Sequence, residues 1–164
     1  MLIVAAIISV GLIAIDQVIK YLVITNMELG QTISVIHFGD TEIFNLTFVY
    51  NEGAAWSIFS GKTSFLLIFT GIFMAGIIFY LIKYASKKPF LAISLSLVIS
   101  GGIGNMIDRI FRDGKVIDYI EARFIDFPIF NFADICVVFG VIFFVLYTLI
   151  FDKDEMKQKE VPNE

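Results

Sequence analysis

Two aspartates in the last third of the chain could act together in hydrolysis. Asp118 lies in the short apolar stretch 116–120, and Asp134 follows Asn131 by three residues. Two carboxylates that lie close together cannot both ionise easily, so one is held protonated near neutral pH. The ionised member can take a proton from water while the protonated member hydrogen-bonds a carbonyl oxygen, which is the chemistry of aspartyl peptide hydrolysis.

Each aspartate also has a structural interpretation. Asn131 and Asp134 have the spacing of a helix cap, and Asp118 could be a solvent-facing loop acid. We favour catalysis because both aspartates fall at the same end of the apolar segments as four other polar residues, Asp16, Asn51, Asn105 and Arg109. A helix amino terminus stabilises a carboxylate, so we expect Asp134 to be the general base and Asp118 the general acid.

Polar residues also interrupt two of the apolar segments. Asp16 and Lys20 carry opposite charges one helical turn apart, and we interpret them as a pair that anchors its helix, with Lys20 extending outward to the interface. Further along, Asn105, Asp108 and Arg109 follow a small-residue face formed by Ser96, Ser100 and Gly104, which suits close helix packing. Three polar groups beside glycine exceed what packing requires, so we expect a functional role there.

Other hydrolytic designs find no support in the sequence. There is no H-E-x-x-H motif, and His37 is the only histidine, so the common zinc-protease and zinc-finger sites are excluded. Ser57, Ser60 and Lys62 look like a polar lead-in to an apolar segment rather than a serine–lysine dyad. The single Cys136 reads as a packing residue. A net charge of −4 argues against nucleic acid as a partner, and we expect no metal and no organic cofactor.

The composition indicates the scaffold that must position these residues. Of the 164 residues, 58% are hydrophobic and only 17% are charged, against about 25% charged in soluble domains. No Asp, Glu, Lys or Arg occurs in residues 1–15, 63–82, 89–107 or 135–151. A membrane-spanning helix needs about 20 mostly apolar residues. The sequence therefore predicts an α-helical membrane protein with four transmembrane helices.

One membrane domain is expected to occupy the whole chain, residues 1–164, with spans at about 1–24, 63–83, 89–109 and 132–151. The first run lacks the basic residues and cleavage site of a signal peptide, so we take it as the first span. Segments 25–62 and 110–131 then lie on the face opposite the termini and the tail 152–164. Residues 32–36 and 44–50 alternate as strands do, which predicts a small β-sheet on that face, and 116–120 is expected to be a short strand after the turn at 113–114.

The basic residues leave the orientation nearly undecided. Six Lys and Arg fall on each side of the predicted spans, and only the cluster Lys83, Lys87 and Lys88 in a short loop favours cytoplasmic termini.

Five short motifs, taken in order, resemble lipoprotein signal peptidase, the bacterial type II signal peptidase, over essentially the whole length. They are residues 16–20 (DQVIK), 51–56 (NEGAAW), 104–109 (GNMIDR), 116–119 (VIDY) and 130–134 (FNFAD). The chain departs from the family picture in its acidic balance, its non-basic amino terminus and Tyr119, where Phe is more usual.

The resemblance implies a four-helix membrane core with a small extracytoplasmic β-sheet and loop helix. It implies an aspartyl endopeptidase that cuts prolipoprotein signal peptides just before the diacylglyceryl-modified cysteine. The motifs assign Asp118 and Asp134 to catalysis, Asp16, Lys20 and Asp108 to structural support, and a third group to substrate binding: Asn51, Gly53, Asn105, Arg109 and Asn131.

The family picture also implies a place in the cell. It predicts a multi-pass protein of the bacterial cytoplasmic membrane, with the active site near the extracytoplasmic face and both termini in the cytoplasm. Its partners would be lipid-modified prolipoproteins and membrane lipids, and a monomer suffices. A different class remains open at this stage: a proton-conducting or assembly subunit in which Asp16, Asp108 and Asp134 relay protons or pair with a partner.

Overall fold

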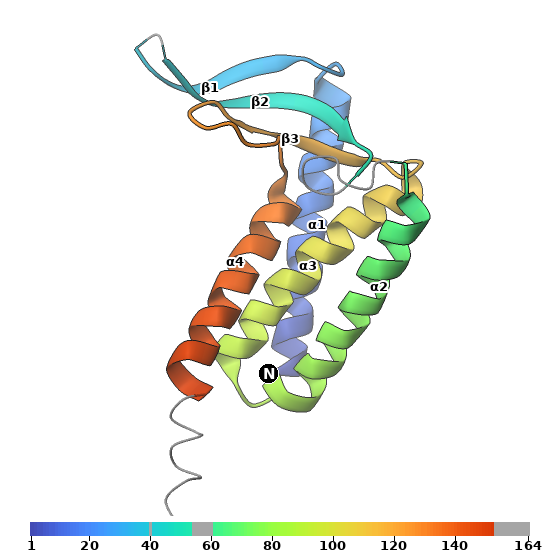
Figure 1. Cartoon of the computed structure of the whole chain (residues 1–164), viewed down its shortest axis with the longest axis vertical. Coiled ribbons are helices and arrows are strands. Elements are labelled where there is room, and N and C mark those ends of the chain that lie inside the picture. The colour runs from blue at the N-terminus through green and yellow to red at the C-terminus, as the bar shows by residue number, and fades with distance from the viewer. Residues whose placement is uncertain (40, 54–60, 153–164) are drawn as a thin grey trace, which may run out of the picture.

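The computed structural model describes residues 1–39, 41–53 and 61–152 (Figure 1). Residues 54–56 of the second motif, the serines at 57 and 60, and the tail from 153 lie outside the described residues. Within the described part, four helices are long and apolar enough to cross a membrane, as the charge-free runs predicted. The helices stand side by side, and a β-sheet lies across one end of the bundle, here called the sheet end.

The helices begin and end close to the charged residues that bound the apolar runs. They are α1 (Leu2–Asn26), α2 (Thr63–Tyr80, continued by a π-helical turn at Leu81–Ala85), α3 (Pro89–Phe111) and α4 (Phe132–Tyr147, continued at Thr148–Asp152). The amino terminus and the end of α4 both lie at the end away from the sheet (Figure 1).

Helix α3 forms the centre of the bundle. Its residues Leu91, Leu95 and Ile99 are at most 5% exposed and pack with Ala5 of α1 and Tyr147 of α4. The outward faces of α1 and α2 carry exposed Ile, Val and Phe side chains, as helices that face lipid do.

The small-residue face predicted on α3 is buried against its neighbouring helices. Ser96, Ser100 and Gly104 are all buried. A Cβ at Gly104 would lie 2.6 Å from the Asp16 carboxylate and 3.3 Å from the Ala133 Cβ, so glycine lets α1 and α4 meet α3 at this point.

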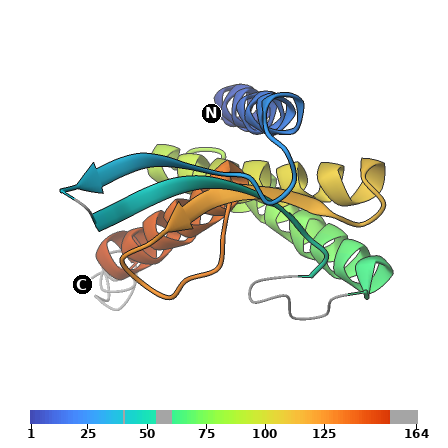
Figure 2. The ribbon, with the colours of Figure 1, turned by 90° about the horizontal axis from the view of Figure 1, so that it is seen from above.

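Three antiparallel strands form the sheet, in the order β1 (Thr32–Phe38), β2 (Thr41–Asn51) and β3 (Val116–Ala122). All three strands were predicted, β1 and β2 from alternation and β3 from the short run that follows a turn. Ile117 and Tyr119 of β3 pack with Phe48 of β2 and Val23 of α1, and this second core fixes the sheet on the bundle (Figure 2). No helix is found in 27–53 or 112–131, so the expected loop helix is not in those described stretches.

Candidate active site

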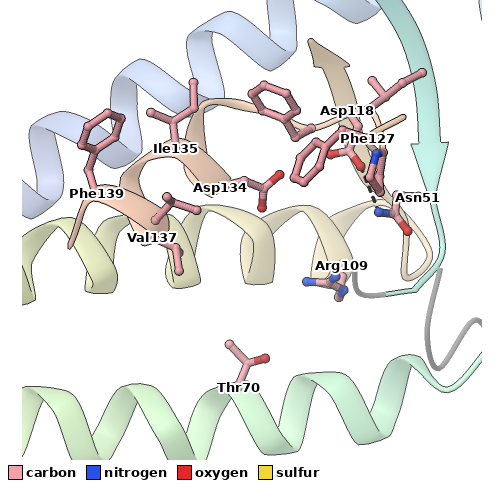
Figure 3. A pocket seen from close by; sticks show the side chains of 13 residues that line it. Asn51, Thr70, Arg109, Asp118, Phe127, Asp134, Ile135, Val137 and Phe139 are labelled. Carbon is pink, nitrogen blue, oxygen red and sulfur yellow. Dashed lines mark hydrogen bonds between the residues drawn. The ribbon is translucent and has the colours of Figure 1, made fainter. Parts of the chain in front are cut away.

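The two aspartates come together at the sheet end, from different elements. Asp118 lies on β3 and is 2% exposed, whereas Asp134 lies in the first turn of α4 and is half-buried. Both line one pocket, and their side chains point into it (Figure 3). The fold thus joins a sheet residue and a helix residue in a single cavity.

Asn131 links the two carboxylates. Its side-chain Nδ2 donates to Asp118 Oδ1 at 2.7 Å, while its backbone N–H donates to Asp134 Oδ2 at 3.0 Å. Its Oδ1 accepts from the backbone N–H of Asp134 at 3.0 Å, which completes a capping box at the start of α4. The structural interpretation of Asn131 and Asp134 is therefore correct, and it does not exclude a place in the site.

Two further asparagines occupy the remaining carboxylate oxygens. Asn51 donates to Asp118 Oδ2 at 2.9 Å, and Asn105 donates to Asp134 Oδ1 at 2.8 Å. All four oxygens thus accept from neutral amide groups. No ion pair of either aspartate is found in the part of the chain that the structure describes. Asp118 is buried, so the solvent-facing interpretation of this residue is wrong.

Burial, and after it the negative charge of Asp134, together raise the pKa of Asp118 to about 7. The hydrogen bonds from Asn51 and Asn131 act in the opposite direction but do not cancel the effect of burial. Asp118 therefore holds a proton below pH 7 while ordinary carboxyls are ionised. The arrangement can provide one protonated and one ionised carboxyl group in the same cavity.

Arg109 closes the side of the pocket that faces α2 (Figure 3). Its Nη2 donates to the carbonyl oxygen of Gly53 at 2.7 Å, and Gly53 N–H donates to Asn51 Oδ1 at 2.9 Å. The buried Nε of Arg109 has no hydrogen-bond partner among the described residues. The predicted residues Asn51, Gly53 and Arg109 thus form one unit at the end of β2.

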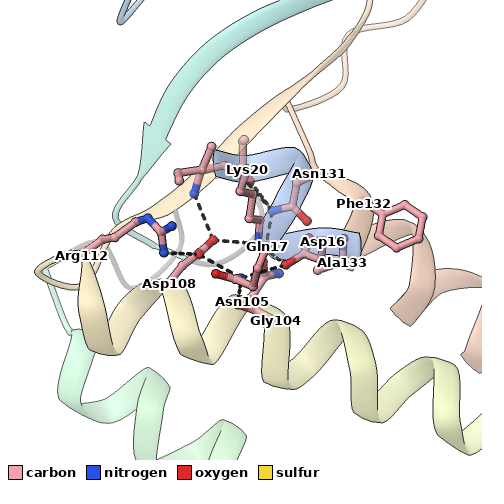
Figure 4. A network of polar contacts seen from close by, with 12 residues as sticks. Asp16, Gln17, Lys20, Gly104, Asn105, Asp108, Arg112, Asn131, Phe132 and Ala133 are labelled. Carbon is pink, nitrogen blue, oxygen red and sulfur yellow. Dashed lines mark hydrogen bonds and ion pairs between the residues drawn. The ribbon is translucent and has the colours of Figure 1, made fainter. Parts of the chain in front are cut away.

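A second polar cluster, here called the ion cluster, lies behind the site (Figure 4). Lys20 Nζ lies 3.0 Å from Asp16 Oδ2 and 2.7 Å from Asp108 Oδ2, and Arg112 lies 2.8 Å from Asp108 Oδ1. Lys20 is completely buried. The expected pairing with Asp16 is present, but the expected outward extension of Lys20 is wrong, because the shared helix face turns toward α3 rather than toward lipid.

The first turn of α4 is fixed by partners from two other elements and by its own capping box. Phe132 N–H donates to the Tyr119 hydroxyl on β3 at 3.1 Å, and Ala133 N–H donates to Asp16 Oδ1 on α1 at 3.1 Å. With the capping box, every free N–H from Asn131 to Asp134 has an acceptor. Asp16 therefore supports the site by holding the helix that carries Asp134.

Beyond the polar groups the pocket is apolar. Its volume is about 600 Å³. Apart from Asn51, Arg109 and the two aspartates, it is lined by Thr70 of α2 and by apolar residues of the 127–130 loop and α4: Phe127, Pro128, Ile129, Phe130, Ile135, Val137, Val138 and Phe139. A second, almost wholly apolar groove of about 520 Å³ lies between α2, α3 and α4, and Val137 lines both. A cavity with a polar end continues into an apolar path.

Several site residues were missed from the sequence. Gln17 donates to Asp108 Oδ1 at 3.2 Å, and Arg112 and Tyr119 have the contacts given above. Arg112 was detectable as the i+4 partner of Asp108, and Thr70 as an isolated hydroxyl in a charge-free run. The structure places no group of three potential metal ligands within the described residues.

Comparison with known proteins assigns this chain to a family. The model of signal peptidase II, a peptidase family, matches residues 8–150. The chain belongs to the signal peptidase II family. It is thus a protease with the four apolar helices of a multi-pass membrane protein.

Known proteins are similar to this signal peptidase II family member over most of its length, in sequence and in fold. The lipoprotein signal peptidases of Staphylococcus aureus strains JH9 and Newman are each 40% identical over 157 residues, covering 94% of this chain and 92% of theirs. A bacterial membrane enzyme structure determined by the in meso method at 2.3 Å resolution is 36% identical, with a TM-score of 0.85 over 98% of this chain and 94% of that one. A similar structure at 1.9 Å resolution is 37% identical, with a TM-score of 0.80 over 91% and 94%.

Proposed function

We propose that this protein is an aspartyl endopeptidase that removes the signal peptide of bacterial prolipoproteins just before the diacylglyceryl-modified cysteine. The observation that carries the proposal is the pair Asp118 and Asp134, which face one cavity and whose hydrogen bonds, among the described residues, all come from neutral amides. The lipoprotein substrate follows from the relatives named above, and the apolar path beside the pair suits a lipid-modified chain.

In the proposed mechanism, ionised Asp134 takes a proton from a water molecule, whose oxygen attacks the scissile carbonyl carbon. Asp118 gives its proton to the carbonyl oxygen, so the intermediate is a neutral diol. When the C–N bond breaks, Asp134 passes its proton to the departing nitrogen and Asp118 recovers a proton from a diol hydroxyl. The dyad returns to its starting state, and no metal or cofactor is needed.

The pocket walls suggest how the substrate is held. Arg109 and Asn51 would bind backbone carbonyls of the substrate around the scissile bond, because both present donors to the cavity and are themselves anchored at Gly53. The apolar side chains of α4 and the groove between α2 and α4 would receive the signal helix from the bilayer. The acyl chains could then stay in lipid during cleavage.

We also infer an orientation in the membrane. We place the sheet end and the site at the extracytoplasmic face of the cytoplasmic membrane, with both termini in the cytoplasm. Two observations support this orientation. The amino terminus and the end of α4 both lie at the end of the bundle away from the sheet, and Lys83, Lys87 and Lys88 lie in the connection between α2 and α3 at that same end. One chain supplies every group of the proposed mechanism, so we take the enzyme as a monomer with lipid and prolipoprotein as its partners.

The experiment compares the single variants Asp118→Asn and Asp134→Asn in purified enzyme with a diacylglyceryl-modified prolipoprotein. Each substitution is expected to slow cleavage by at least about a hundredfold, the usual contribution of a positioned acid or base. Asp126→Asn is the matched control, because it changes an exposed aspartate of the same outer segment and should retain the wild-type rate. Near-normal cleavage by either dyad variant would refute the assignment.

A second arm tests the substrate. The same preprotein without its diacylglyceryl group is expected to remain uncut under conditions in which the modified one is processed. Equal cleavage of both would show that the lipid is not recognised.

A further inference from the structure

Lys20 is connected to the proposed dyad through one side chain. Besides its two carboxylate partners, its Nζ donates to Asn105 Oδ1 at 2.9 Å (Figure 4). An ammonium group has three N–H donors, and the three partners use all of them. Asn105 lies at the boundary between the ion cluster and the site, since its other end donates to Asp134.

The contact with Lys20 fixes the direction of the Asn105 amide. Lysine can only donate, so the amide oxygen must face it, and Asn131 Nδ2 donates to that same oxygen at 3.1 Å. A flipped amide would place its NH₂ group against the ammonium and against another NH₂. The Asn105 Nδ2 group therefore has to face Asp134 Oδ1 as a donor.

This fixed donor stabilises the ionised form of Asp134 but not that of Asp118. A donor whose own oxygen is held by a cation favours the ionised form of its acceptor. Asp134 has such a donor, whereas Asp118 accepts from Asn51, whose oxygen accepts the Gly53 N–H and contacts no cation among the described residues. The charged and titratable groups around the dyad come from the elements packed against it. They are Asp16 and Lys20 of α1, Asp108 and Arg109 of α3, Tyr119 of β3, Cys136 of α4, and Arg112 just beyond α3.

We propose that Lys20 is a positioning residue for catalysis, which orients the Asn105 amide and thereby keeps Asp134 as the ionised and Asp118 as the protonated member of the dyad. This inference rests on the proposed function and adds the origin of the asymmetry. It gives Lys20 a task beyond pairing with Asp16 and Asp108.

The test must remove the ammonium without leaving a buried excess charge. In Lys20→Met/Asp108→Asn, one cation and one anion leave the ion cluster together, so that Asp16 and Arg112 remain. The matched control Arg112→Met/Asp108→Asn also removes one cation and one anion but keeps Lys20 against Asn105. Lys20→Met/Asp16→Asn removes the ammonium by an independent route and leaves Asp108 paired with Arg112.

The readout is the pH profile of kcat and kcat/KM for the diacylglyceryl-modified prolipoprotein. Losing a nearby cation destabilises the singly ionised dyad, so both Lys20 variants should show an acidic limb moved to higher pH by about one unit. They should also lose about tenfold in kcat below that limb, with little change in KM. The Arg112 control should retain the wild-type limb.

Two results would overturn the proposal: acidic limbs of the Lys20 variants that superimpose on the control, or an equal displacement in all three variants. Failure of the proposed function is separate, because it requires that Asp118→Asn or Asp134→Asn still cleaves. If those variants are inactive and the limbs nevertheless do not move, only the role of Lys20 is wrong.

Discussion

The ion cluster and the dyad both contact Asn105 of α3, but they balance buried charge differently. In the ion cluster two acids, Asp16 and Asp108, meet two cations, Lys20 and Arg112, at 2.7–3.0 Å. In the dyad, among the described residues, two acids meet neutral amides at 2.7–3.0 Å. Paired charges hold the helices together, whereas acids without a paired cation favour keeping a proton. The difference indicates which group supports the fold and which performs the chemistry.

The largest effect is expected from breaking the balance of the ion cluster. Lys20→Met leaves Asp16 and Asp108 buried with one excess negative charge, which costs about 3–5 kcal/mol when a buried pair is broken. The thermal midpoint of the purified protein should fall far more than in Lys62→Met, which changes an exposed lysine. Equal midpoints in the two variants would mean that the cluster does not stabilise the bundle.

Ionisation of the dyad should destabilise the folded protein as the pH rises toward 7. Asp118 has a pKa of about 7 in the folded protein and an ordinary value of 3.8, so the folded state binds the proton more tightly. Stability is therefore highest below pH 3.8 for this group and is lost as pH rises through about 7, by on the order of 4 kcal/mol in total.

Thermal midpoints measured across that pH range test this expected loss of stability. The midpoint of the wild type should decrease toward alkaline pH, and Asp118→Asn should remove most of the decrease because it deletes the titrating group. Asp126→Asn should behave like the wild type, since its side chain is exposed. A pH dependence unchanged by Asp118→Asn would contradict the unbalanced charge of the dyad.

The smallest effect concerns Tyr119, which follows a dyad residue but contacts the scaffold. Tyr119→Phe leaves the Phe132 N–H without its acceptor and should cost about 1 kcal/mol. The limbs of the cleavage pH profile should stay in place. Tyr21→Phe, which removes an exposed hydroxyl, is the control for the thermal midpoint. A displaced limb in Tyr119→Phe would assign Tyr119 to the chemistry instead.

Much of the fold could be predicted because its signals are local. Charge-free runs mark the helices, alternation marks the strands, and Asn131 with Asp134 marks the start of α4 as a capping box. The pairing of β2 with β3 and the approach of α1 to α3 depend on residues far apart in the sequence, which no short pattern specifies. The pairing of the strands within the sheet and the contacts of α1 with α3 in the ion cluster therefore had to come from the structure.

The same limit explains why the predicted direction of the Lys20 side chain was wrong. Helical periodicity places it on one face with Asp16 but does not say what that face meets. In the structure Asp108 and Gly104 of α3 lie there, so the lysine points inward. Tyr119 was hidden for a related reason, because its acceptor role depends on where β3 ends relative to α4.

The central claim is that one carboxyl group of the dyad is protonated while the ion cluster is ionised. The infrared carbonyl stretch of protonated carboxyl groups, followed by pH titration of the protein in lipid, measures this directly. We expect a protonated carboxyl that disappears with a midpoint of about 7, is absent from Asp118→Asn, and persists in Asp108→Asn. A signal that survives in Asp118→Asn, or no protonated carboxyl below pH 7, would contradict the account.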